Sequence, residues 1–148
     1  MQTPSVERSI RAAAFTLGIL FLLLGLVGFL PNFVSVPEDA VSVNGFGYVL
    51  GLFPTNYLHN AIRILVGLWG LAASTSLVGS ITFNQIFAVL YFGEAFLGLF
   101  PGANTLFGRM PLYGNDVWLN VVTAAAAAYY GFVKPASPSG NLGTSTNP

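Results

Sequence analysis

Long apolar stretches separated by polar linkers dominate the chain, and this pattern predicts helices that cross a membrane. A spanning helix needs about 20 predominantly apolar residues. Four stretches of about that length follow one another, at residues 12–30, 58–78, 81–100 and 117–133. Pro31 closes the first stretch and Pro101 the third, because proline cannot continue a helix. The pattern predicts an all-α fold, a bundle of four transmembrane helices in a single domain.

The linkers between these stretches differ greatly in length. Only Gly79, Ser80 and their neighbours separate the second stretch from the third, which predicts a tight antiparallel helical hairpin. The first linker, residues 32–57, is long and contains an apolar run at 46–53, which is too short to span and is therefore predicted to be interfacial or re-entrant. Residues 1–134 form the predicted domain. The tail at 135–148 is rich in Pro, Ser, Gly and Thr and is predicted to be disordered.

Short motifs recur in the two halves of the chain. Gly-Phe-Leu-Pro at 28–31 resembles Gly-Leu-Phe-Pro at 98–101, and the helix starts at 56–60 and 116–120 are also similar. The recurrence predicts two tandem helix-loop-helix units. Residues spaced three and four apart share one helix face, and small residues on such a face allow helices to pack closely. The predicted packing residues are Gly18, Gly25, Gly28, Gly67, Gly70, Ser74 and Gly98.

Composition supports a membrane protein and excludes several other classes. Only 7% of the residues are charged, whereas about 25% are charged in an ordinary soluble domain. The formal net charge of zero excludes a basic nucleic-acid-binding protein. The chain has no cysteine, so it has no disulfide framework, thiolate metal site or thiol nucleophile.

The distribution of basic residues predicts the orientation of the bundle. With four spans both termini lie on one side, together with Arg8, Arg11 and Lys134, whereas the other side carries only Arg109 among basic residues. The positive-inside rule then predicts a multi-pass protein with cytoplasmic N- and C-termini. A signal peptide is the rival interpretation of residues 12–30. Its apolar core would be longer than the usual 7–15 residues, and no Ala-x-Ala-like site follows it.

Two charges, Arg63 and Glu94, fall inside the apolar stretches. At 1.5 Å per residue they lie about 7.5 Å and about 9 Å from the same membrane face. An isolated charge there costs at least about 2.5–3.5 kcal/mol, so we expect an Arg63–Glu94 ion pair between the second and third helices. The pair is interpreted either as a structural lock or as the centre of a ligand or ion site. The other members of such a site would be His59, Asn60, Tyr91, Asp116 and Asn120.

The remaining polar and titratable residues predict neither a catalytic residue nor a metal or other cofactor. His59 is the only histidine, which excludes haem ligation by two histidines of one chain. A zinc site would need carboxylates at an unusual distance in the sequence. We therefore expect that the protein is not an enzyme.

Three motifs suggest a family. They are the F-P-T-N-x-x-H-N segment at 53–60, the Gly67-x-x-Gly70 step, and N-D-x-x-L at 115–119. The chain resembles, over roughly residues 10–133, the bacterial domain-of-unknown-function family numbered 4383. The resemblance implies a four-helix integral membrane protein, in a bacterial plasma membrane or a thylakoid membrane, with no established activity. Members tend to carry a second histidine where this chain has Arg63, and Leu-His where it has Leu119-Asn120.

The sequence thus predicts a small integral membrane protein with a structural, accessory or assembly role in a membrane complex. Its expected partners are the lipid bilayer and either another membrane protein or a second copy of the chain, with no nucleic acid. The alternative is a carrier or binding protein for a small ligand or ion that uses Arg63 and Glu94. An enzyme or electron carrier is a third class, disfavoured by one histidine and no cysteine.

Overall fold

The computed structural model describes residues 3–38 and 45–136, and most of them are helical. This part of the chain contains four long helices: α1 (Pro4–Val27), α2 (Tyr57–Ala73), α3 (Leu77–Leu97) and α4 (Asn115–Ala128). A π-helical turn, η3 (Tyr129–Val133), continues α4 into the short α5 (Lys134–Ala136). Two short 3₁₀ turns, η1 (Pro31–Phe33) and η2 (Ala103–Thr105), lie in the long loops.

Within the described residues, two helices are long and apolar enough to cross a membrane. They are α1, with 24 residues, and α3, with 21. Helix α2 has 17 residues and α4 has 14 before the π-helical turn that continues it, and neither is one of these two candidate spans. The structure therefore supports a mostly helical protein with two candidate spans, where the sequence predicted four.

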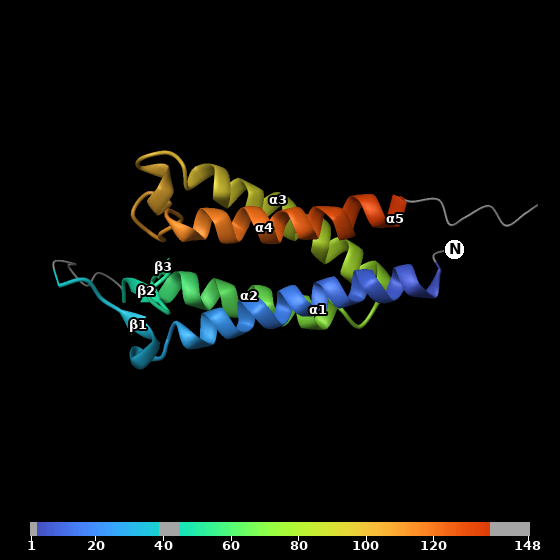
Figure 1. Cartoon of the computed structure of the whole chain (residues 1–148), viewed down its shortest axis with the longest axis horizontal. Helices are drawn as coiled ribbons and strands as arrows, with labels where there is room; N and C mark the ends of the chain where they lie inside the picture. Colours follow the sequence, from blue (N-terminus) through green and yellow to red (C-terminus); the bar gives the residue numbers. More distant parts are fainter. Residues whose placement is uncertain (1–2, 39–44, 137–148) are drawn as a thin grey trace, which may run out of the picture.

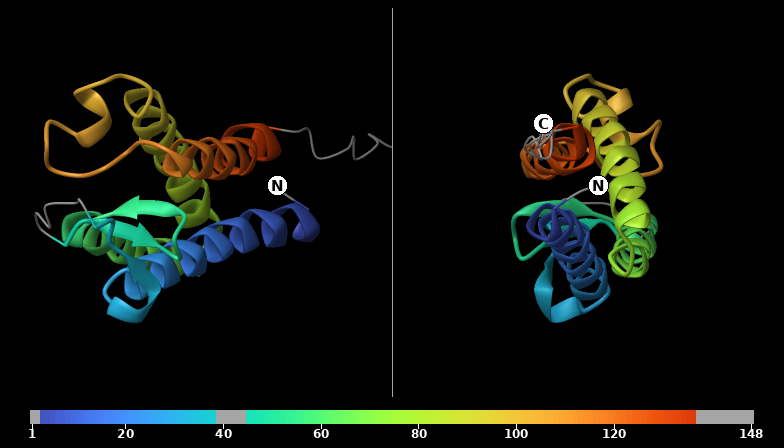
Figure 2. Two further views of the ribbon diagram at one scale, coloured as in Figure 1. Left: turned by 60° about the vertical axis from the view of Figure 1, so that its left-hand side comes forward. Right: turned by 90° about the vertical axis from the view of Figure 1, so that its right-hand side faces the viewer.

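The helices form two pairs. Helix α1 packs along α2, and α3 packs along α4 (Figure 1). Helix α3 also contacts α1 and α2, so that it connects the two pairs, as the two views in Figure 2 show. The turn between α2 and α3 is tight, but it lies at residues 74–76, and the predicted turn residues Gly79 and Ser80 lie in the first turn of α3. The Ser76 hydroxyl caps α3 by accepting a hydrogen bond from the Gly79 amide at 3.0 Å.

A small sheet, which the sequence analysis did not predict, lies in the loop between α1 and α2. Its strands β1 (Val34–Ser35), β2 (Gly47–Val49) and β3 (Phe53–Thr55) pair antiparallel in the order β1-β2-β3. The apolar run at 46–53 forms most of the β2–β3 hairpin. Three residues, Leu50 to Leu52, separate the paired Val49 and Phe53. Leu50 and Gly51 have positive φ values of 55° and 70°, which favour the tight reversal of a hairpin.

The two ends of the helical bundle differ. The sheet and the loop between α3 and α4 lie at one end, and the N-terminus and α5 lie at the other (Figure 1). Lys134 and the two residues after it are helical in α5, so the predicted tail does not begin at residue 135. Residues 137–148, the rest of that tail, lie outside the described residues.

The apolar core lies between the two helical pairs. Phe21 of α1 meets Phe87 and Tyr91 of α3 edge to face, with ring centroids 5.1 and 4.8 Å apart. Phe87 and Tyr91 stack on each other at 4.0 Å. These aromatic contacts hold the pairs in register, and the buried polar residues continue from this core toward the sheet.

Candidate functional site

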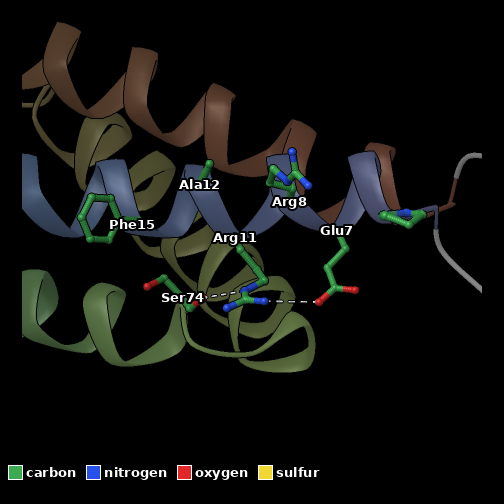
Figure 3. Close-up of a pocket in the computed structure, with 7 residues that line it drawn as sticks. Glu7, Arg8, Arg11, Ala12, Phe15 and Ser74 are labelled. Carbon is green, nitrogen blue, oxygen red and sulfur yellow. Dashed lines mark hydrogen bonds and ion pairs between the residues drawn. The ribbon is translucent and has the colours of Figure 1, made fainter.

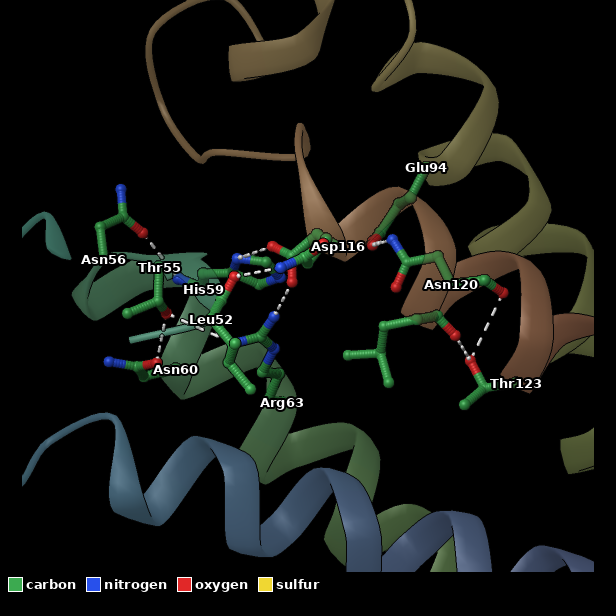
Figure 4. A network of polar contacts seen from close by, with 12 residues as sticks. Leu52, Thr55, Asn56, His59, Asn60, Arg63, Glu94, Asp116, Asn120 and Thr123 are labelled. Carbon is green, nitrogen blue, oxygen red and sulfur yellow. Dashed lines mark hydrogen bonds and ion pairs between the residues drawn. The ribbon is translucent and has the colours of Figure 1, made fainter. Parts of the chain in front are cut away.

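An ion pair between α2 and α4 is the centre of the buried polar cluster. The Nη2 of Arg63 lies 2.7 Å from Oδ1 of Asp116, and the two residues are 1% and 0% exposed (Figure 4). Asp116 is in the first turn of α4, where the positive end of the helix dipole favours a carboxylate. Each charge is thus compensated by the other in a place that water does not reach.

The predicted Arg63–Glu94 pair is therefore wrong in its acidic partner. Glu94 instead accepts a hydrogen bond from the Nδ2 of Asn120 on α4, at 3.3 Å. The pattern of apolar residues placed Asp116 just outside the fourth stretch, where a charge needs no partner. In the structure α4 begins at Asn115, and the preceding loop folds against the hairpin so that Asp116 is buried.

His59 lies on the other side of Asp116. Its Nδ1 is 3.6 Å from Oδ2 of Asp116, and the side chain is 2% exposed (Figure 4). The imidazole also forms a hydrogen bond with the backbone of Pro54. Within the described residues, three buried polar atoms of this group have no hydrogen-bond partner: Nδ1 of His59, Nε of Arg63 and Oδ2 of Asp116.

Asn60 and Thr55 extend the cluster to α1 and the sheet. The Nδ2 of Asn60 donates to the carbonyl of Gly28 at the end of α1, at 2.7 Å, and its Oδ1 accepts from the Thr55 hydroxyl at 2.5 Å. The Nη1 of Arg63 donates to the same hydroxyl at 3.5 Å. Sequence reasoning did not select Thr55, although it lies within the F-P-T-N-x-x-H-N segment that carried the resemblance.

Further amides join the two long loops above the cluster. Asn56 caps α2 by accepting from the His59 amide at 2.9 Å, and its Nδ2 donates to the carbonyl of Arg109 at 2.7 Å. The Nδ2 of Asn115 donates to the carbonyl of Leu52 in the hairpin, at 3.1 Å. Sequence reasoning assigned no role to these two amides, because a loop asparagine carries no periodic signal.

A tyrosine pair also closes this end of the molecule. Burial raises the pKa of Tyr113, in the loop before α4, to about 12, and a hydrogen bond with Tyr48 of β2 contributes. The bond joins the loop before α4 to the β2–β3 hairpin. The cluster is covered by two loops that hold each other in place.

The glycines selected from the sequence lie at close helix contacts. A Cβ on Gly18 would lie 2.8 Å from the backbone nitrogen of Leu71, and one on Gly70 would lie 2.8 Å from Cα of Gly18. Gly67 faces the backbone of Leu22. The others lie equally close to their neighbours: Gly25 and Gly28 against Asn60, and Gly98 against Leu112. Ser74 is the C-cap of α2, and its carbonyl accepts a hydrogen bond from Arg11 of α1.

The structure therefore brings together most of the predicted site residues. His59, Asn60, Arg63 and Asp116 form one connected group. Glu94 and Asn120 form a second group one turn along α4, and Tyr91 belongs to the aromatic core. Within the described residues, no group of three or more His, Asp or Glu side chains is placed to hold a metal ion. The arrangement can hold helices together, and its unpartnered atoms could bind a small polar molecule.

The fold and this cluster define a class: a mostly helical protein whose described residues include two helices long and apolar enough to cross a membrane, with an ion pair buried between its helical pairs. A family model described as "Domain of unknown function (DUF4383)" matches residues 11–133. The chain belongs to this family, which confirms the resemblance seen in the sequence. No curated protein and no solved structure matches the chain.

Proposed function

We propose that the chain is a four-span integral membrane protein with cytoplasmic termini, and that it is a structural, accessory or assembly component of a membrane complex. Helices α1 and α3 have the length and composition of spans. Helices α2 and α4 lie beside them, and α4 gains length from η3 and α5. Large apolar side chains point outward from every helix, for example Phe15, Leu65, Val89 and Val122. Such a surface favours lipid or an apolar partner over water.

This proposal rests on the observation that the buried charged side chains are bonded to other side chains of the same chain. Arg63 is bonded to Asp116 and to Thr55, and Glu94 accepts from Asn120. The contacts link α2 with α4 and α3 with α4, so they stabilise the bundle itself. A carrier needs polar groups that a ligand can reach, whereas Arg63 and Asp116 are at most 1% exposed.

Single-cysteine labelling tests the membrane topology, because the natural chain has no cysteine of its own. Ser5→Cys probes the end with the termini, and Phe107→Cys probes the loop between α3 and α4, where the side chain is 83% exposed. In intact cells a membrane-impermeant maleimide should label Phe107→Cys and leave Ser5→Cys unlabelled until the cells are opened. Release of the protein from membranes by alkaline carbonate would contradict the proposal.

Gentle detergent extraction, native electrophoresis and mass spectrometry test the accessory role. The chain should migrate in a complex with a defined companion. The double variant Arg63→Met, Asp116→Leu removes both charges and keeps a similar volume, so it should still enter that complex. A natural chain that purifies as a monomer without a companion would overturn the accessory role.

A carrier or binding protein for a small polar ligand is the second candidate. The unpartnered Nδ1 of His59, Nε of Arg63 and Oδ2 of Asp116 favour it, because three buried polar atoms close together could receive a ligand or water. In that case a small molecule should co-purify with the natural chain. The Arg63→Met, Asp116→Leu variant should lose it while keeping its fold.

A further inference from the structure

A cavity of about 580 Å³ lies at the opposite end of the bundle from the ion-pair cluster, between the start of α1 and the end of α2. It is bounded by both charged and apolar side chains. The lining residues are Pro4, Glu7, Arg8, Arg11, Ala12, Phe15 and Ser74 (Figure 3). None of these residues takes part in the hydrogen bonds or ion pairs of the ion-pair cluster, so the cavity is separate from that cluster.

The basic groups of this cavity are positioned by the helices. The Nε of Arg11 donates to the carbonyl of Ser74 at the end of α2, at 2.9 Å, which fixes the guanidinium against the cavity wall. Its Nη1 lies 3.4 Å from Oε1 of Glu7 (Figure 3). The side chain of Arg8, which also lines the cavity, makes no hydrogen bond or ion pair within the described part of the chain. Two guanidiniums against one carboxylate leave the lining with a net positive charge.

The start of α1 adds to this positive potential. The first amides of a helix have no partner in the helix, and the helix dipole places a partial positive charge there. Arg8 and Arg11 lie within the first two turns of a 24-residue helix. An anion in the cavity would therefore be attracted by two arginines and by the helix end, opposed by Glu7 alone.

The apolar part of the lining suggests which kind of anion is bound. Phe15 lies one helical turn beyond Arg11, toward the middle of the bundle, and is 52% exposed. Ala12 lies between them on the same helix. A ligand that fills the whole cavity would have an anionic head near Arg8 and Arg11 and an apolar portion along Phe15. A phospholipid has this arrangement, with its phosphate at the depth of the polar headgroups.

We propose that this cavity binds the phosphate of an anionic phospholipid, with an acyl chain lying along Phe15. The proposal rests on the membrane insertion proposed above, because it places the end with the termini at the cytoplasmic headgroup layer. The net positive lining selects an anionic lipid over a zwitterionic one. The exposed aromatic ring selects a lipid over free phosphate.

Lipid titration of the detergent-purified full chain, followed by native mass spectrometry, tests this proposal. The probes are phosphatidylglycerol, phosphatidylcholine and inorganic phosphate. Phosphatidylglycerol should bind at least about 10-fold more tightly than phosphatidylcholine, and Arg8→Gln with Arg11→Gln should lower its affinity by about 10-fold or more. Arg8→Gln alone keeps the contact between Arg11 and Ser74, so it separates lipid affinity from any loss of fold. Its affinity should fall by several-fold.

Arg109→Gln is the matched control, because Arg109 lies in the loop at the far end of the bundle. This variant should bind phosphatidylglycerol like the natural chain. Equal binding of the two lipids, or an unchanged affinity in Arg8→Gln, would overturn the proposal. Equal competition by inorganic phosphate would also overturn it, in favour of a site for free anions. The titration is made in detergent, so its failure is distinct from a failure of the topology experiment.

Discussion

Two interfaces of the bundle hold their helices together in opposite ways. Between α1 and α2, glycines bring the backbones together, with Gly18 facing Gly67 and Gly70. Between α2 and α4, in contrast, long side chains bridge the helices through Arg63 and Asp116. The first interface depends on close contact of backbones, and the second depends on a buried pair of charges.

The difference shows how the two kinds of interface fail. Glycine contacts gain dispersion energy over many atoms, so a single added methyl group disturbs them moderately. A buried ion pair concentrates its energy in two groups, and removing one leaves the other charge without compensation. We therefore expect single substitutions to be most damaging between the helical pairs and less damaging within the first pair.

Breaking the ion pair should give the largest effect. Arg63→Met leaves Asp116 buried without its partner and should lower the free energy of unfolding by about 3–5 kcal/mol. The double variant Arg63→Met, Asp116→Leu should be clearly less destabilised than Arg63→Met alone. Denaturation in detergent micelles, followed by circular dichroism, measures both. Equal destabilisation of the single and double variants would show that the two charges do not depend on each other.

Filling the glycine interface should give a smaller loss. A Cβ on Gly67 would press against the backbone of Leu22, so Gly67→Ala should destabilise the chain by about 1–3 kcal/mol as α1 and α2 move apart. Gly93→Ala is the matched control, because the space around Gly93 is open within 4 Å. That variant should be neutral or stabilised by up to about 1 kcal/mol. If the two variants had the same thermal stability, close packing at Gly67 would be refuted.

Neutralising Glu94 should give the smallest effect. Within the described residues, the Glu94 carboxylate accepts a hydrogen bond from the Asn120 side chain at 3.3 Å. A glutamine at this position can accept the same bond. Glu94→Gln should therefore change the free energy of unfolding by about 1 kcal/mol or less. Asp116→Asn should be far more damaging, since it removes the charge that compensates Arg63. Thermal unfolding of the two variants side by side distinguishes Asp116 from Glu94 as the partner of Arg63.

Much of the fold follows from local signals in the sequence. Apolar stretches, prolines and small residues are local signals that extend over only a few positions. They allow the four helices, their order and a tight turn after α2 to be predicted. The packing glycines are readable for the same reason, since spacing alone places Gly18, Gly67 and Gly70 on helix faces. Membrane crossing by α2 and α4 remains a prediction, because the two helices of the described residues that are long and apolar enough to cross a membrane are α1 and α3.

The partner of Arg63 could not be predicted because it depends on how a loop folds. Asp116 is adjacent to the fourth apolar stretch and has the appearance of a charge at a helix end. The loops around it are joined by the hydrogen bonds from Asn115 to Leu52 and from Asn56 to Arg109, which are contacts across 63 and 53 residues. The β2–β3 hairpin escaped prediction in a similar way, since its turn uses Leu50 at positive φ in place of the usual Asn or Gly.

The distance in sequence between Arg63 and Asp116 has a consequence for the making of the protein. The two residues are 53 positions apart, so at about 5–20 residues per second the arginine is synthesised some 3–10 s before its partner. During that interval the first helical pair can form through its glycines, with an unpaired arginine still facing the place that α4 will occupy. A chain that stops short of Asp116 keeps that charge uncompensated. A chain that lacks α4 therefore differs from the finished protein in one chemical respect: its Arg63 has no carboxylate partner.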